Sequence, residues 1–79
     1  MTDQHEFLPM WVVYDHPLDM PDRFVARRWL TLPNNRPTQE VLTADKLDDL
    51  RYAIQRAMPG AVRLDRSPDD DAKIMEVWL

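Results

Sequence analysis

The sequence contains no cysteine and only one glycine in 79 residues. Without cysteine the chain cannot form a disulfide, a thiolate zinc site or a cysteine nucleophile, and this absence favours a cytoplasmic location. It also lacks a run of about 18 apolar residues, which a membrane-spanning helix requires. Asp3 and Glu6 stand where a signal peptide would carry positive charge, so we expect neither a membrane span nor a secretory signal.

Positive charge is also scarce. Ten Lys and Arg against fourteen Asp and Glu give a formal net charge of −4, and this balance disfavours binding to the phosphates of nucleic acid. The hydrophobic share of 44% and the charged share of 30% are typical of a globular protein. A chain of this length has room for one domain with a small core. We expect that domain to span residues 10–79, after a frayed start over residues 1–9.

Short runs rich in β-branched, aromatic or alternating apolar residues predict several strands. The candidate strands are residues 10–14, 24–32, 38–42, 61–65 and 74–79, of which 38–42 is a short edge strand. The first two are separated by a loop that carries Pro17 and Pro21, and they predict a hairpin. The last two alternate and predict a second hairpin.

One amphipathic helix is predicted over residues 44–58. Its apolar stripe consists of Leu47, Leu50, Ile54 and Met58, at spacings of three and four. Thr43 is a candidate N-cap, and Gly60 is suited to a left-handed helix end. The chain therefore predicts a small α+β fold in the order β-β-(β)-α-β-β, with one helix on one face of a mostly antiparallel sheet of four or five strands.

A single helix about 22 Å long can cover one face of such a sheet and not both. The opposite face must contact water or a partner. Alternation in the last two strands predicts that one set of residues lies away from the helix: Arg63, Asp65, Glu76 and Trp78. The set expected beneath the helix is Val62, Leu64, Met75, Val77 and Leu79. For the first two strands, sequence order leaves the face open.

Three tryptophans in a chain this short can serve core packing or a contact surface, because tryptophan is large, seldom fully buried and often an interface anchor. The expected patch combines Trp78 with either Trp11 or Trp29 and is rimmed by Arg63, Glu76 and either Arg27 or Arg28. We therefore predict a non-enzymatic module that binds a protein partner or a second copy of itself. The predicted interaction residues are Trp11, Arg28, Trp29, Arg63, Glu76 and Trp78.

The alternative is a small-ligand, metal or catalytic site in the loop that contains Asp15, His16, Asp19 and Asp22. A histidine beside carboxylates can serve general acid–base catalysis, although aspartate is also favoured in turns for geometric reasons. Residues 69–71, three successive aspartates, could join this loop if the two hairpins meet at one end of the sheet. They lack the glycine and glutamate of a calcium-binding EF-hand loop. We assign no cofactor, metal ligand or catalytic residue.

Four segments also carry a family resemblance. They are residues 11–17 (Trp-Val-Val-Tyr-Asp-His-Pro), 21–29 (Pro-Asp-Arg-Phe-Val-Ala-Arg-Arg-Trp), 66–71 (Arg-Ser-Pro-Asp-Asp-Asp) and 76–78 (Glu-Val-Trp). With these segments, and over most of its length, the chain resembles a family of short bacterial proteins of no established function. The resemblance implies a compact, stand-alone bacterial protein and assigns no site residue.

Overall fold

The computed structural model describes residues 9–31, 35–65 and 73–79, which form five strands and one helix. In chain order these are β1 (Pro9–Asp15), β2 (Phe24–Leu30), β3 (Arg36–Ala44), α1 (Leu47–Ala57), β4 (Arg63–Asp65) and β5 (Ile74–Trp78). The predicted frayed start lies outside the described residues except for Pro9, which opens β1.

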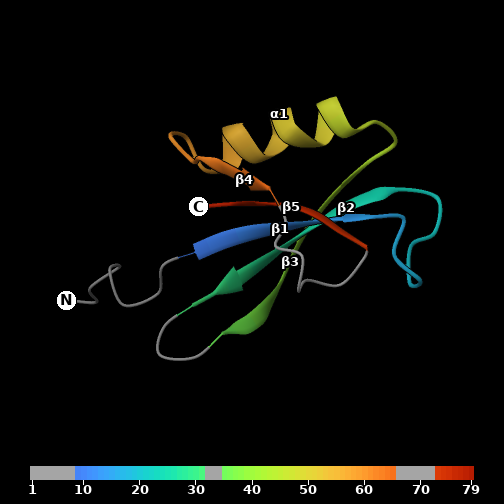
Figure 1. Ribbon diagram of the computed structural model, residues 1–79, viewed down its shortest axis with the longest axis horizontal. Helices are drawn as coiled ribbons and strands as arrows, with labels where there is room; N and C mark the ends of the chain where they lie inside the picture. The colour runs from blue at the N-terminus through green and yellow to red at the C-terminus, as the bar shows by residue number, and fades with distance from the viewer. Residues whose placement is uncertain (1–8, 32–34, 66–72) are drawn as a thin grey trace.

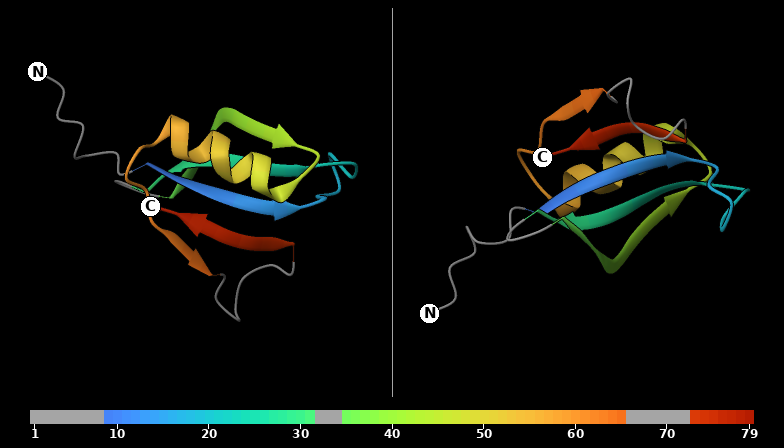
Figure 2. Two further views of the ribbon diagram at one scale, coloured as in Figure 1. Left: turned by 90° about the horizontal axis from the view of Figure 1, so that it is seen from above. Right: turned by 60° about the horizontal axis from the view of Figure 1, so that its bottom comes forward.

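The strands form one antiparallel sheet in the order β3-β2-β1-β5-β4. The central strand β1 pairs with β2 on one side and with β5, the last strand of the chain, on the other (Figure 2). The helix α1 lies across one face of this sheet (Figure 1). The predicted α+β class and both predicted hairpins, β1–β2 and β4–β5, are confirmed. In the described residues, no helix has the length and apolar character needed to cross a membrane.

The apolar stripe of the helix faces the sheet, as predicted. Leu50 and Ile54 are fully buried, and Leu47 and Met58 pack at the margin of the core. The core cluster under α1 consists of Trp11, Val13, Ala26, Leu50, Ile54 and Trp78. Gly60 has a φ of +85°, which confirms the expected left-handed residue after the helix.

The start of the helix differs from the prediction. Strand β3 continues to Ala44, so Thr43 lies in a strand rather than at the N-cap, and α1 begins at Leu47 with Lys46 as an N-cap that makes no side-chain capping bond. The reason is pairing: Leu42 and Ala44 lie opposite Ala26 and Phe24 of β2 and pack against the core. Burial of these side chains in a longer strand outweighs the propensity of this segment to extend the helix.

The face predicted for β5 is wrong. Trp78 lies opposite Trp11 of β1, and both indoles belong to the core cluster under α1. Glu76, two residues earlier on the same side of the strand, is hydrogen-bonded to Arg51 of the helix. These two residues therefore point toward the helix and not away from it.

The face predicted for β4 is wrong for the same reason. Arg63 and Asp65 lie opposite Trp78 and Glu76 in the β4–β5 pair, so they share the helix side. The set expected beneath the helix lies on the far side instead: Val62, Leu64, Val77 and Leu79. Met75 is the exception, because the irregularity in the β1–β5 register makes it an extra residue, and its side chain packs against the core.

Candidate functional site

The alternative ligand loop does not gather its polar side chains into one site. The His16 ring nitrogen Nδ1 donates to the neighbouring Asp15 carboxylate, whereas Asp19 accepts from Arg27 of β2. Asp22 is exposed. In residues 9–31, 35–65 and 73–79 no three His, Asp or Glu side chains are placed to hold a metal ion. The three aspartates of residues 69–71 lie outside the described residues.

The predicted interaction residues divide between the two faces of the sheet. Trp11 and Trp78 are 4% and 5% exposed beneath the helix. Arg28 also lies on the helix side, since it follows the alternation of Phe24 and Ala26. Of the three indoles, only that of Trp29 lies on the opposite face, where it shares a small cavity with residues of β1 and β5.

A buried charged cluster explains why Glu76 can lie under the helix. Glu76 is only 3% exposed, and its carboxylate accepts hydrogen bonds from Arg51 Nη2 at 2.7 Å and Arg51 Nε at 3.2 Å. The indole nitrogen of Trp78 donates to the same carboxylate at 2.8 Å, and Arg63 Nη1 lies 4.0 Å from it. A buried carboxylate with such partners avoids the cost of an unpaired charge.

This cluster sets the ionisation of Glu76. Burial by itself raises the pKa of its carboxyl group. The hydrogen bonds from Arg51 and Trp78, together with the charges of Arg51 and Arg63, outweigh that effect and lower the pKa below its ordinary value. The group is therefore a carboxylate in the folded protein at neutral pH.

We expect acid to remove the stability that Glu76 contributes. Because its pKa is lower in the folded chain than in the unfolded chain, this contribution is complete above the ordinary pKa of 4.5 and is lost as the pH falls through the lowered value. The measurement is urea unfolding of the protein and of Glu76→Gln at about pH 7 and about pH 3. The stability gap between the two proteins should narrow in acid, and an equal gap at both pH values would contradict the assignment.

The sheet face opposite α1, which we call the open face, is almost entirely apolar. Its members follow from the strand registers: Met10, Val12, Tyr14, Val25, Arg27, Trp29, Pro37, Val41, Thr43, Leu64, Ile74 and Val77, with Val62 and Leu79 flanking β4 and β5. No helix of the described chain lies on this side (Figure 2, right). The open face therefore carries apolar side chains of all five strands without a covering helix, and its central members Val12 and Val25 are themselves buried, at 5% and 0% exposed.

Exposure on the open face is greatest at its β4–β5 end. Val62, Leu64 and Leu79 are 61%, 46% and 51% exposed, and large apolar patches of this kind mark contact surfaces. Sequence reasoning missed these residues because it assigned them to the core. Their apolar character was visible in the sequence, but the side on which they lie was not.

Trp29 is the aromatic residue of this face. It lines a cavity of about 190 Å³ together with Met10, Val12, Tyr14, Asn35, Ile74 and Val77. Its indole nitrogen is buried and has no acceptor within the described part of the chain. The ring therefore contributes apolar area to this surface and not a directed hydrogen bond.

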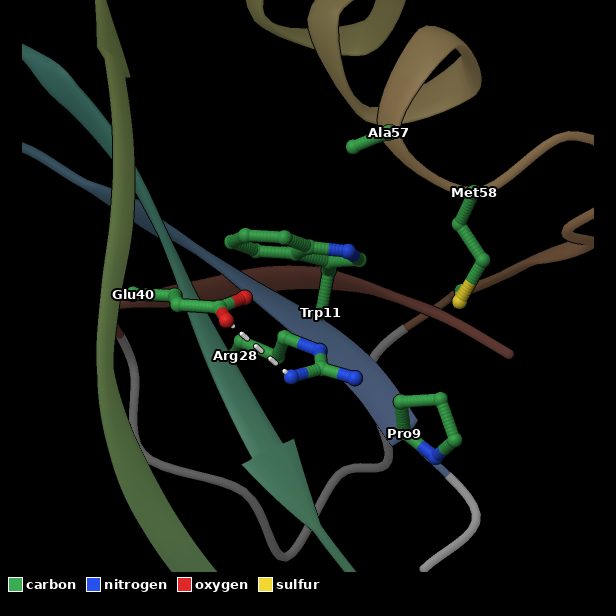
Figure 3. Close-up of a pocket in the computed structure, with 6 residues that line it drawn as sticks. All are labelled: Pro9, Trp11, Arg28, Glu40, Ala57 and Met58. Carbon is green, nitrogen blue, oxygen red and sulfur yellow. Dashed lines mark hydrogen bonds and ion pairs between the residues drawn. The ribbon is translucent and has the colours of Figure 1, made fainter. Parts of the chain in front are cut away.

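A second hollow lies on the helix side, at the C-terminal end of α1 (Figure 3). Trp11, Arg28 and Glu40 bring an indole, a guanidinium and a carboxylate to it, and Arg28 Nη1 donates to Glu40 Oε1 at 3.3 Å. Sequence reasoning named Trp11 and Arg28 but not Glu40, since their meeting depends on the pairing of β1, β2 and β3.

The resemblance to short bacterial proteins stays a prediction. No protein family model, no curated protein and no solved structure matches the chain.

Proposed function

We propose that this protein is a non-enzymatic interaction module whose open face packs against the open face of a second copy. The observation that carries the proposal is the apolar character of the sheet side that α1 leaves uncovered. Two such faces form a sheet-on-sheet interface, in which side chains of both sheets interdigitate about 10 Å apart. A cytoplasmic location, which the lack of cysteine favours, is part of the proposal.

The charge distribution favours a second copy as the occupant. Arg27 is the one charged residue among the described members of the open face, and it is paired with Asp19 of the neighbouring loop. The chain has a net charge of −4, but none of the described members of the open face is a carboxylate, and the neighbouring Asp19 is paired with Arg27. A two-fold dimer is the commonest assembly in which a surface contacts its own copy.

The size of the open face fits an interface at the lower end of the usual range. At about 3.3 Å per residue and about 4.8 Å between strands, the strand residues of the sheet cover about 500 Å². Side-chain relief and the flanking Val62 and Leu79 add to this, so a dimer approaches the roughly 800 Å² per subunit of a standard interface. We therefore expect a dimer with a dissociation constant on the order of micromolar.

Light scattering after size exclusion, over a range of concentrations, tests the proposal. The protein should reach twice its 9.4 kDa, and Leu64→Lys should weaken association at least about 10-fold, because two-fold symmetry buries two ammonium groups. Leu64 is 46% exposed, so the monomer should still fold.

Tyr52→Lys is the matched control, since Tyr52 is a 60% exposed residue of α1, away from the open face. It should leave the dimer unchanged. A folded protein that stays monomeric at the highest concentration, or a dimer that Leu64→Lys leaves intact, would refute the proposal.

A further inference from the structure

Two hollows adjoin at the end of the sheet where α1 terminates. The smaller has a volume of about 270 Å³ and is lined by Pro9, Trp11, Arg28, Glu40, Ala57 and Met58. The larger has a volume of about 680 Å³ and is lined by Pro9, Met10, Thr31, Asn35, Met58 and Leu79. Pro9 and Met58 line both hollows, so the two are neighbours. The two hollows differ in chemical character.

The smaller hollow offers hydrogen-bond donors. The Arg28 guanidinium uses Nη1 for Glu40, which is its single side-chain contact among the described residues. Its Nη2 points away from Glu40, toward the side of Pro9 and Met58 (Figure 3). The indole nitrogen of Trp11 lies at the end of the ring nearest Met58 (Figure 3) and donates to no residue of the described chain. Two N–H donors that have no partner among the described residues, one of them charged, therefore border the same space.

The larger hollow is lined mainly by apolar side chains. Pro9, Met10, Met58 and Leu79 surround it, and Thr31 and Asn35 stand at its rim. Because Pro9 and Met58 line both hollows, an aliphatic chain held in the smaller one can extend past them toward the larger. The combined arrangement has a polar head site and an apolar tail site, as small-molecule sites commonly do.

We propose that these hollows bind an aliphatic monocarboxylate, with its carboxylate on Arg28 and Trp11 and its tail against Met10, Met58 and Leu79. Carboxylates match the planar, two-donor edge of a guanidinium. Glu40 holds Arg28 from the opposite side and leaves the site with little net charge. A single negative charge is therefore accepted better than the double charge of a phosphate, which Glu40 would repel.

This site overlaps the proposed dimer surface only in part. The part of the site that binds the carboxylate lies on the helix side of the sheet. Of the residues that line the tail site, only Met10 and Leu79 also belong to the open face. Binding should therefore occur in Leu64→Lys as well as in the unsubstituted protein. If the protein proves monomeric and still binds the ligand, only the dimer proposal fails.

Titration of the protein with octanoate tests the inference. Binding is measured by calorimetry and by the indole N–H signals in NMR spectra. Octanoate should bind and shift the indole N–H signal of Trp11. The indole N–H of Trp78 is hydrogen-bonded to Glu76, so its signal should stay in place. Acetate lacks the aliphatic tail, octylamine carries a positive charge, and inorganic phosphate carries more than one negative charge. Each should bind at least about 10-fold more weakly than octanoate.

Arg28→Gln should weaken octanoate binding by about 10- to 100-fold, because it removes the charged donor. Arg56→Gln, an exposed substitution on α1 outside both hollows, is the matched control and should leave the affinity unchanged. Any of three results would overturn the inference. These are tighter binding of phosphate or octylamine than of octanoate, equal octanoate affinity in Arg28→Gln, and octanoate binding without a shift of the Trp11 signal.

Discussion

Removal of residues 77–79 is expected to leave the chain unfolded. These residues carry half of the paired positions of β5 with β1 and two of the three with β4, and the described part of β4 pairs with no other strand. The truncation also deletes Trp78, a 5% exposed member of the core cluster. Loss of a buried tryptophan alone costs about 3–5 kcal/mol, while a domain of this size has a total stability of roughly 4–12 kcal/mol.

Far-ultraviolet circular dichroism and urea unfolding measure this effect. The truncated chain should show no cooperative transition, whereas Leu79→Ala, which keeps the backbone bonds to Val62, should lose less than about 1 kcal/mol. A truncated protein that unfolds as cooperatively as the full chain would show that β5 is not needed for the sheet.

Arg51→Met is expected to destabilise the protein by about 2–4 kcal/mol. The substitution removes the hydrogen bonds that Arg51 gives to Glu76, a residue that is 3% exposed, and leaves its carboxylate with Trp78 and the more distant Arg63. Methionine keeps most of the aliphatic length of the side chain, so the loss reports mainly on the charge. Urea unfolding at neutral pH measures it.

Two further variants separate the ion pair from the general effect of changing a helix residue. Arg56→Met, which removes an exposed contact with Tyr52 on the same helix, should cost no more than about 0.5 kcal/mol. Adding Glu76→Gln to Arg51→Met should recover part of the loss, because no buried charge is then left unpaired. Equal stabilities of Arg51→Met and Arg56→Met would contradict the role assigned to Arg51.

The failed face assignment has a clear physical origin in β5. Its two sides carry Trp78 and Glu76 on one and Ile74 and Val77 on the other, so both are partly apolar. Alternation identified the strand but contained no information on which side the helix covers. That choice depends on Arg51, 25 residues away along the chain, which makes burial of Glu76 possible.

The correction changes which residues support an interaction surface. Under the sequence-based assignment, the last two strands placed Arg63, Asp65, Glu76 and Trp78 on the uncovered side, together with a second indole from Trp11 or Trp29. The structure instead places Val62, Leu64 and Val77 there. The expectation of an uncovered face came from counting helices and did not depend on the assignment that failed.

The sequence by itself determined the local structure of this protein. The β-branched runs specify strands, the spacing of Leu47, Leu50 and Ile54 specifies the buried side of α1, and Gly60 specifies the end of the helix. These signals depend on neighbouring residues, so they can be read along the chain. Only the tertiary structure decided the strand order, the side of β4 and β5 that the helix covers, and the meeting of Trp11, Arg28 and Glu40. Those outcomes depend on contacts between segments that are distant in the sequence. When both faces of a strand are apolar, burying either face gives a similar energy, and a distant partner such as Arg51 decides which face is buried.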